Sequence, residues 1–226
     1  MIENSLLAAL PRKAYQHLLA GLESVTLTFG EVLYEPGDKI RHVFFPGDAL
    51  VSLLTLADGH LALEVGLIGR DGMVGIPLVL GHDLSPVRAL VQGAGTALRM
   101  TSARFLKDFR RSPPLQRELY RYTYALMAQI SQTAACNRFH VVERRLARWL
   151  LMTHDRVKSD QFRMTHEFLG HMLGVRRVGV TKAAQALQKH GLISYSRGAI
   201  TILDRRNLEL AACECYRVVK DMHDGA

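Results

Sequence analysis

Residues 164–203 contain two short amphipathic helices, a glycine turn and a small hairpin in that order, and this segment constrains the fold more than any other. Thr165 can cap the first helix, because its hydroxyl accepts a hydrogen bond from a backbone amide that has no helical partner. Gly174 can end that helix in the left-handed conformation. A second helix is expected over residues 176–190, followed by two short strands within residues 192–203. This order predicts a winged helix-turn-helix.

The second of these helices divides into two faces. Its apolar positions recur at helical spacing and predict the buried face: Val180, Ala183, Ala184 and Leu187. The opposite face carries Arg177, Val178, Thr181, Lys182 and Gln185. In helix-turn-helix proteins the second helix enters the major groove with its N-terminal end toward the base edges, and Arg and Lys hold the phosphates. We therefore expect this face to meet DNA.

Positive charge is concentrated on the same part of the chain. Residues 1–111 contain eleven Lys or Arg and eleven Asp or Glu, whereas residues 140–203 contain eleven and four. A basic face attracts the phosphate backbone because binding releases condensed counterions. Two amphipathic helices around a glycine also occur in helical domains that never contact DNA. The charge asymmetry favours DNA binding over that alternative.

Residues 23–100 show a different pattern, with short apolar runs between Gly, Asp and Pro. The candidate strands are residues 26–29, 43–45, 50–56, 61–67 and 89–91. Asp58 and Gly59 predict a hairpin turn between two of them, since both residues tolerate positive φ. Several short strands at regular spacing predict an antiparallel sandwich or jelly roll. We expect residues 1–112 to form this β-rich domain.

Residues 115–140 contain no Gly or Pro and predict one long helix, which we assign to residues 113–140. Its apolar positions are Leu119, Tyr122, Leu126, Met127, Ile130 and Ala134. Such a stripe needs a partner, and we expect the same helix of a second copy, because two-fold pairing places two recognition helices about 34 Å apart. Packing on its own β-domain is the alternative. Gln129 and Thr133 leave the pairing register open.

Residues 141–226 are assigned to the DNA-binding domain. Within a helix over residues 142–153, Leu146, Trp149, Leu150 and Met152 are expected in the core. Three arginines are expected on its outside, as a solvated face or as phosphate contacts: Arg144, Arg145 and Arg148.

The three cysteines, Cys136, Cys213 and Cys215, form an odd set that does not indicate a disulfide framework. Cys213 and Cys215 alone offer two ligands where structural zinc needs four, so we expect ordinary thiols and no metal site. No apolar run approaches the ~20 residues of a membrane span, and the N-terminus lacks a signal-peptide pattern. We expect a cytoplasmic protein without membrane contact.

Together these features resemble the cyclic-AMP receptor protein and Fnr (Crp/Fnr) superfamily of bacterial transcription regulators. The most specific motifs are Thr165-His166-Glu167-Phe168-Leu169-Gly170, Leu173-Gly174-Val175-Arg176-Arg177 and Gly191-Leu192-Ile193. In the first domain, the matching motifs are Gly37-Asp38, Val43-Phe44-Phe45 and Gly72-Met73-Val74-Gly75. The resemblance implies an α+β chain with a cyclic-nucleotide-binding-like jelly roll, a long dimerisation helix and a C-terminal winged helix-turn-helix.

The candidate effector pocket departs from the family's cyclic-AMP site. In cyclic-AMP-binding members a Gly-Glu pair holds the ribose and an Arg-Ser pair holds the cyclic phosphate. Here Gly75 is followed by Ile76, and the later pair aligns with Val87 and Arg88. Ile76 and Val87 remove two polar contacts, so cyclic AMP is disfavoured and the effector is unknown. No cysteine precedes Cys136, so the N-terminal iron–sulfur cluster of Fnr-type members is absent.

The resemblance also implies roles at the DNA. The family reads bases with Arg, Glu and a later Arg, at positions that correspond to Arg177, Val178 and Lys182. Arg177 can pair with guanine O6 and N7, whereas Val178 cannot accept a hydrogen bond from cytosine and suits a thymine methyl. The operator should therefore differ from that of the receptor protein. The remaining contacts are assigned to phosphates: Thr165, Arg176, Thr181 and Arg197.

The expected function is a homodimeric regulator that binds double-stranded DNA at a pseudo-palindromic site and contacts or occludes RNA polymerase. It is expected not to be an enzyme, because a metal-dependent oxygenase would need a His-X-His and carboxylate set that residues 23–100 lack. Three alternatives stay open. They are gating by an unidentified small-molecule effector, a ligand-free scaffold that binds DNA constitutively, and a ligand-binding β-barrel that does not bind DNA.

Overall fold

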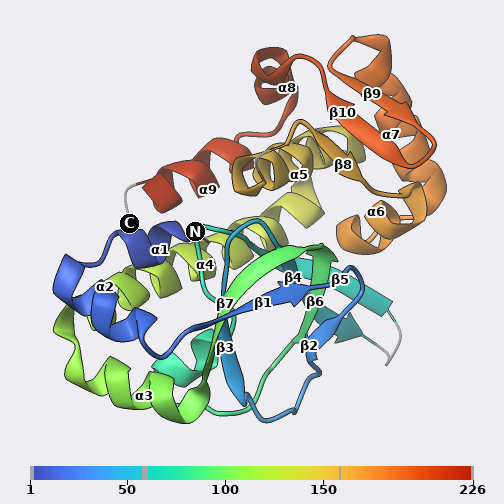
Figure 1. Cartoon of the computed structure of the whole chain (residues 1–226). Helices are drawn as coiled ribbons and strands as arrows, with labels where there is room; N and C mark the ends of the chain where they lie inside the picture. Colours follow the sequence, from blue (N-terminus) through green and yellow to red (C-terminus); the bar gives the residue numbers. More distant parts are fainter. Residues whose placement is uncertain (1–2, 58–60, 158, 225–226) are drawn as a thin grey trace.

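The computed structural model describes residues 3–57, 61–157 and 159–224. Figure 1 shows a β-rich N-terminal domain and a mainly helical C-terminal domain, with one long helix between them. This α+β architecture confirms the predicted fold class. In the described part of the chain, no helix is long and apolar enough to cross a membrane.

The N-terminal domain is built from two antiparallel sheets. Its strands are β1 (Glu23–Leu27), β2 (Val32–Tyr34), β3 (His42–Pro46), β4 (Leu50–Ala57), β5 (Leu61–Ile68), β6 (Arg88–Gly93) and β7 (Gly95–Thr101). One sheet has the order β1-β7-β3 and the other the order β2-β6-β4-β5. Apolar side chains of both sheets, including Phe45, Val51 and Val91, are fully buried in one core. The predicted sandwich is therefore present.

The five predicted strands are found, with ends that differ by a few residues. β4 and β5 pair antiparallel as expected, while the Asp58-Gly59 turn lies outside the described residues. β2 and β7 were missed. β2 has only three residues, which are too few to show an alternating pattern. β7 begins at Gly95, a residue that normally indicates a turn, and glycine is needed there because the backbone of residues 48 and 49 lies close by. A Cβ there would stand 2.5 Å from the Ala49 nitrogen.

Short helices pack around one end of the sandwich. They are α1 (Ser5–Ala8), α2 (Arg12–Leu19), the 3₁₀ helix η1 (Ile76–Leu80) and α3 (Ser102–Arg111). The buried Asn4 side chain caps α1 by accepting from the Leu7 amide, and it donates to the carbonyl oxygens of Pro46 and Gly72, each at 2.9 Å. The first residues of the described chain are thereby fixed to the β-domain.

The long helix α4 spans Pro113–Phe139, and its 27 residues make a rod about 40 Å long. Ser112 caps it by accepting from the Leu115 amide. Leu119, Tyr122 and Leu126 are buried against the β-domain. The expectation that these three face a second copy was wrong, and the alternative of packing on the chain's own domain describes them. A different stripe of α4, which includes Tyr124, is exposed.

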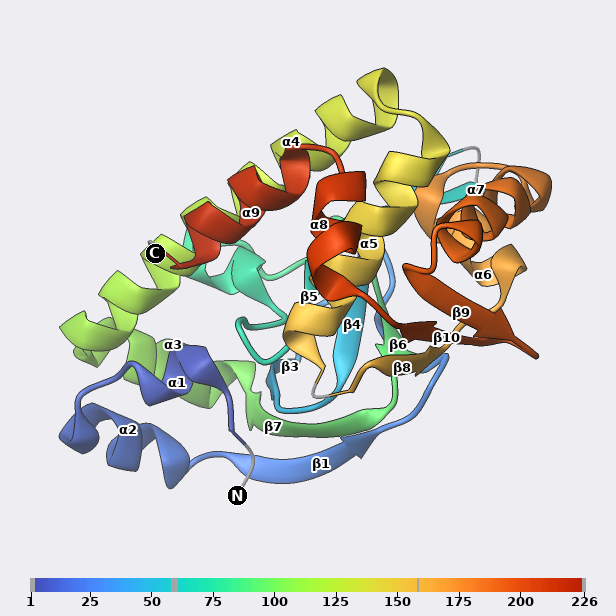
Figure 2. The same ribbon diagram turned by 90° about the horizontal axis from the view of Figure 1, so that it is seen from above.

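The C-terminal domain contains the predicted helix-turn-helix and wing. Its elements are α5 (Val142–Arg156), β8 (Gln161–Arg163), α6 (His166–Leu173), α7 (Arg177–Lys189), β9 (Ile193–Ser196), β10 (Ala199–Ile202), α8 (Arg205–Ala211) and α9 (Cys215–Asp224). The wing hairpin β9–β10 gains a third strand, because β8 pairs with β10. Figure 2 shows α9 running back along α4, so the last described residues pack on the long helix.

Helix α5 lies in the middle of this domain. The prediction that its three arginines lie on the outside was only partly correct. Arg144 is exposed, but Arg145 and Arg148 are only 7% and 6% exposed. Arg145 donates to the Asn137 side chain at 2.7 Å, and Arg148 donates to the Thr133 hydroxyl at 2.8 Å. Both arginines point into the protein, toward α4, and Arg145 also donates to the Leu173 carbonyl at the end of α6.

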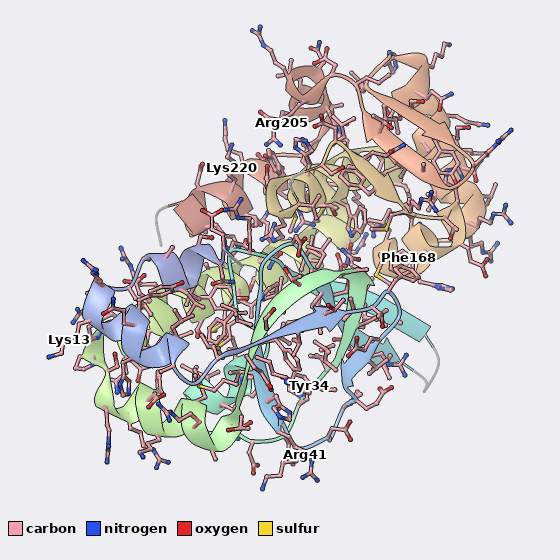
Figure 3. The ribbon with its side chains drawn as sticks, in the orientation of Figure 1. Lys13, Tyr34, Arg41, Phe168, Arg205 and Lys220 are labelled. Atoms are coloured by element: carbon pink, nitrogen blue, oxygen red, sulfur yellow. The ribbon has the colours of Figure 1, made fainter. Side chains whose placement is uncertain are left out.

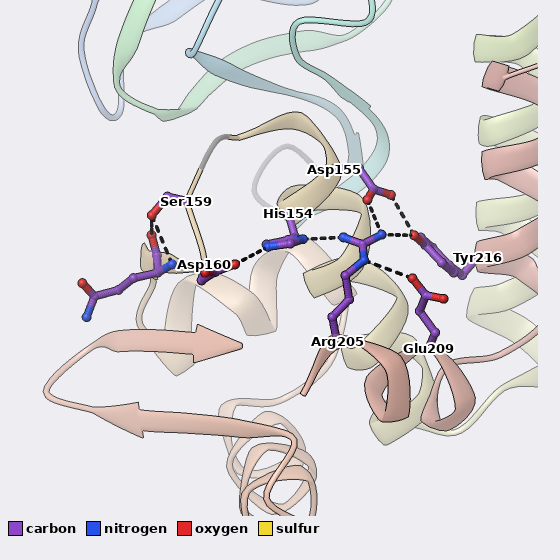
Figure 4. Close-up of polar contacts among 8 residues, drawn as sticks. His154, Asp155, Ser159, Asp160, Arg205, Glu209 and Tyr216 are labelled. Carbon is purple, nitrogen blue, oxygen red and sulfur yellow. Dashed lines mark hydrogen bonds and ion pairs between the residues drawn. The ribbon is translucent and has the colours of Figure 1, made fainter. Parts of the chain in front are cut away.

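Arg205 joins α8 to α5 and α9 in one polar network, which Figure 4 shows in detail. Its guanidinium donates to Asp155 at 2.6 Å, to the Tyr216 hydroxyl at 2.7 Å and to Glu209 at 3.1 Å. The Tyr216 hydroxyl in turn donates to Asp155 at 2.9 Å. These contacts hold the two C-terminal helices against α5, behind the helix-turn-helix.

Candidate DNA-binding face, effector cavity and domain interface

The turn between α6 and α7 is short and depends on two glycines. Thr165 caps α6 by accepting from the Phe168 amide at 3.1 Å. Gly174 ends the helix at φ +60°, as predicted, and the Val175 amide donates to the Gly170 carbonyl at 2.9 Å. A Cβ on Gly170 would stand 2.9 Å from the Val175 carbonyl oxygen. Glycine at this position lets the chain turn sharply into α7.

Helix α7 has the two faces that the sequence predicts. Val180, Ala183, Ala184 and Leu187 are all buried. Among the residues assigned to DNA, Arg176, Arg177 and Lys182 are exposed, and Val178 is 58% exposed. The N-terminal half of α7 therefore presents three cations and one apolar side chain to solvent.

Thr181 differs from its neighbours on this face, because its hydroxyl bonds within the protein. It donates to the Arg177 carbonyl at 3.1 Å and lies 2.9 Å from Nδ1 of His166. The His166 ring stacks on Tyr195 of the wing, with ring centroids 4.0 Å apart. Burial, together with the charge of Arg177, lowers the pKa of His166. The sequence analysis missed His166, which joins α6, α7 and the wing.

The helix-turn-helix is docked on the β-domain. The rings of Phe29 and Phe168 pack with centroids 5.6 Å apart, and Figure 3 shows Phe168 at this boundary. A Cβ on Gly174 would stand 2.7 Å from Cδ1 of Leu63, so the turn itself touches β5. Thr165 and Arg197 line a groove of about 1000 Å³ beside the same contact. These two predicted phosphate ligands therefore lie close to the domain interface.

A polar network crosses the interface, and no motif in the sequence indicates it. The buried Glu64 of β5 accepts from the Trp149 indole at 2.8 Å and from the Ser52 hydroxyl at 2.7 Å. Burial raises the pKa of Glu64 to about 7, although both hydrogen bonds oppose the shift. Nearby, the buried Arg156 forms an ion pair with Asp71 at 2.8 Å.

A largely apolar cavity of about 700 Å³ opens between the β-domain and α4. The candidate pocket residues Gly75, Ile76 and Val87 line it, as do Thr123, Leu126 and Ile130 of α4. Arg88 was wrongly placed in this pocket, because it is absent from the lining and forms an ion pair with Glu35 at 2.9 Å.

The cavity has few polar groups. Neither Arg nor Lys occurs among the described residues that line the cavity. The ionisable residues of the lining are Tyr34, His82 and Asp83. The Tyr34 hydroxyl donates to the His42 carbonyl, and burial raises the pKa of Tyr34. The lining therefore lacks a cation to neutralise a phosphate and suits an apolar ligand.

Four potential metal ligands converge where α4 ends and α9 begins. Cys136, His140, Cys213 and Cys215 have donor atoms that all lie within 4.8 Å of one another. Sγ of Cys136 lies 3.5 Å from Sγ of Cys213, and this contact, together with the charge of Arg148, lowers the pKa of Cys136. The number of potential ligands is four and not the two expected from Cys213 and Cys215, because Cys136 and His140 join them from a distant part of the chain.

The comparisons with known proteins identify the C-terminal domain. Residues 144–211 match the model of the Crp-like helix-turn-helix domain. No curated protein matches the chain significantly in sequence.

Solved structures share the fold over most of the chain. FixK2 from Bradyrhizobium japonicum has a TM-score of 0.73 at 14% identity and covers 85% of this chain and 98% of its own. CLP from Xanthomonas campestris, a c-di-GMP-responsive global regulator, has a TM-score of 0.69 at 17% identity, with coverages of 85% and 99%. A CRP/FNR-family transcriptional regulator from Thermus thermophilus has a TM-score of 0.66 at 20% identity, with coverages of 84% and 98%. The last two of these similar proteins are described as regulators.

Proposed function

This chain has the Crp/Fnr transcription-regulator fold and a Crp-like helix-turn-helix domain, and from this we propose that it binds a pseudo-palindromic DNA site as a homodimer. The observation that carries the proposal is the exposed basic N-terminal half of α7, with Arg176, Arg177 and Lys182 all open to solvent. A helix presented in this way fits the major groove.

We assign Arg177, Val178 and Lys182 to the bases and Arg176 to a phosphate. Arg177 begins α7, where recognition helices approach base edges, and its guanidinium has the geometry to pair with guanine. Val178 offers only an apolar surface, which suits a thymine methyl. Thr165, Thr181 and Arg197 are assigned to phosphates, the first two with hydroxyls that also bond within the protein.

The exposed stripe on α4 supports the dimer. Tyr120, Tyr124 and Met127 are 53%, 62% and 61% exposed and follow one another at spacings of four and three residues. This is the spacing at which helices pair in a coiled coil. The stripe continues through Ser131 and Ala134, which are also exposed. Pairing two copies along it would remove three large apolar side chains per chain from water.

The cavity supports gating by an effector that is apolar rather than a cyclic nucleotide. Its wall includes Leu126 and Ile130 of α4, so an occupant would touch the helix proposed to pair. A ligand-free scaffold that binds DNA constitutively is the second candidate, because Ile76 and Val87 stand where cyclic-AMP-binding members have polar contacts. In either case, the position of the DNA site at a promoter would decide whether the bound protein contacts RNA polymerase or occludes it.

Selection of DNA sites in vitro by the purified, ligand-free protein tests the proposal. We expect a two-fold-symmetric site, bound far above random DNA, with an affinity that falls as salt rises. A site found without added ligand would favour the constitutive scaffold over gating.

The selection can be repeated with the metabolites of a cell extract added. Weak binding without sequence preference under both conditions would count against the DNA-binding assignment. If such metabolites restored the selection of a symmetric site, effector gating would be the better description.

A further inference from the structure

The Cys/His cluster, defined as Cys136, His140, Cys213 and Cys215, holds every cysteine of the chain in one place. Cys136, Cys213 and Cys215 are buried, and His140 is half-buried. Cys136 and His140 lie one turn apart at the end of α4, whereas Cys213 and Cys215 flank the start of α9. We propose that these four side chains bind a single divalent metal ion, zinc by its chemistry, in a Cys₃His site.

The distances suit one ion. Around tetrahedral zinc, with Zn–S near 2.3 Å and Zn–N near 2.0–2.1 Å, neighbouring donors stand roughly 3.6–3.8 Å apart. Sγ of Cys136 lies 3.5 Å from Sγ of Cys213, and Sγ of Cys215 lies 3.4 Å from Nδ1 of His140. Two donor pairs are thus already near coordination spacing. Any remaining pair, at 4.8 Å or less, needs to close by about 1 Å.

Other uses of the cluster fit less well. Cys136 and Cys213 are too far apart to be a disulfide, whose sulfurs stand about 2.05 Å from each other, and a third cysteine would be left over. In an iron–sulfur cluster the protein ligands are shared among two or more irons, which would spread the donor atoms further apart than around one ion. Three thiolates and an imidazole are soft ligands that select zinc over magnesium or calcium.

The surroundings supply a compensating charge and a hydrogen bond. Three thiolates, one neutral imidazole and one divalent ion carry a net charge of −1. Arg145 and Arg148 are buried beside the cluster, and in the described residues neither forms an ion pair with a carboxylate. Their positive charge can offset that of the loaded site. The Gln132 amide donates to Sγ of Cys215 at 3.0 Å, as outer partners do for metal-bound thiolates.

Four protein ligands leave no position open for a substrate, so the site is structural. The ion would join the end of α4 to the start of α9. Its ligand His140 lies two residues before α5 begins at Val142. It would therefore fix the corner at which the long helix meets the DNA-binding domain. This inference does not depend on the proposed DNA-binding function, and its test uses no DNA.

The test begins with the untagged protein purified in reducing buffer. We expect one zinc per chain by elemental analysis, and none of the three thiols open to a thiol reagent until a chelator is added. Cobalt added to the metal-free protein should give thiolate-to-cobalt absorption in the near ultraviolet and the strong visible bands of a tetrahedral site.

Two variants and a control assign the ligands. Cys213→Ser and His140→Ala should each weaken cobalt binding by more than about tenfold, since even loss of an outer partner costs that much. His190→Ala removes an exposed histidine at the end of α7 and should bind cobalt as the parent does.

Three results would overturn the proposal. One is a folded parent protein that retains no metal and gives no tetrahedral cobalt spectrum. Another is free thiols that react equally with and without zinc. The third is a Cys136–Cys213 disulfide, found by mass spectrometry in protein purified without reductant, that persists when zinc is supplied; it would make the cluster a redox pair instead.

Discussion

Trp149 of α5 donates its indole N–H to the buried carboxylate of Glu64 on β5, at 2.8 Å across the boundary between the two domains. Trp149 is the only tryptophan of the chain, so tryptophan fluorescence reports on the surroundings of this residue, which include the contact with Glu64. The hydrogen bond joins a carboxylate of the β-domain to the helix that supports the helix-turn-helix. The stability of the protein should therefore depend on the ionisation of this carboxylate.

The first prediction concerns pH. The pKa of Glu64 is about 7 in the folded protein, above the value of about 4.3 for an exposed glutamate. The folded state therefore holds the proton more tightly, and this stabilisation is fully present below about pH 4.3. It is lost as the pH rises to about 7, and the loss is on the order of 3 kcal/mol because one pKa unit corresponds to about 1.4 kcal/mol.

Urea unfolding followed by Trp149 fluorescence, at about pH 4 and pH 8, would measure this difference, and a titration of the folded protein should show a transition near pH 7. Glu64→Gln keeps an oxygen for the indole but cannot ionise, so it should remove both effects. An unchanged pH dependence in Glu64→Gln would assign the effect to another group.

The second prediction concerns base reading. Arg177→Ala should cost about 1–3 kcal/mol on the selected site and relax the preference at one base position. Arg176→Ala should weaken binding to all sequences alike and reduce the slope of affinity against salt by about one. Lys189→Ala is the matched control, since it removes an exposed cation from the other end of α7. Equal losses for Arg177→Ala on specific and random DNA would contradict its assigned role.

The third prediction concerns the dimer. Tyr124→Glu places a charge in the middle of the exposed stripe on α4, where pairing would bury it without a partner, and should shift the protein to monomers. Ala103→Glu makes the same charge change at an exposed position of α3 and should leave the oligomeric state as it is. Sedimentation velocity distinguishes the two. A dimer that survives Tyr124→Glu would mean that copies pair through another surface.

The fourth prediction concerns the cavity. A neutral apolar fluorophore such as N-phenyl-1-naphthylamine should brighten on binding, and Val87→Trp should reduce its affinity severalfold by filling the space that Val87 lines. Arg88→Ala is the neighbouring control, because Arg88 does not line the cavity. Cyclic AMP should neither displace the fluorophore nor raise the melting temperature. Displacement by cyclic AMP would show that the pocket holds a phosphate without a cation.

The sequence predicted the parts of the site that local rules determine. Helical spacing identified the buried face of α7, including Val180 and Leu187, and the left-handed preference of glycine placed the end of α6 at Gly174. These positions depend only on residues within a few turns. The roles proposed for Arg177 and its neighbours at DNA remain predictions.

Contacts between distant segments could not be predicted in the same way. Arg145 and Arg148 carry charges that usually mark a solvated face, yet α4 covers them. Cys136 and Cys213 are 77 residues apart, and only the return of α9 along α4 brings them together. Glu64 likewise lies in an ordinary strand and becomes unusual only when α5 packs on it.

The side chain of Gln129 holds α4 to β5. Its side-chain amide donates to the Leu67 carbonyl at 3.3 Å and accepts from the Leu67 amide at 3.4 Å, both inside the protein. Sliding of α4 along its own axis would break both hydrogen bonds, whereas a tilt about Gln129 would preserve them. The residues of α4 that line the cavity lie on both sides of Gln129, with Leu126 before it and Ile130 after it. The two hydrogen bonds therefore fix the position of α4 along β5 at the level of the cavity, so an occupant of the cavity would touch the long helix beside this fixed point.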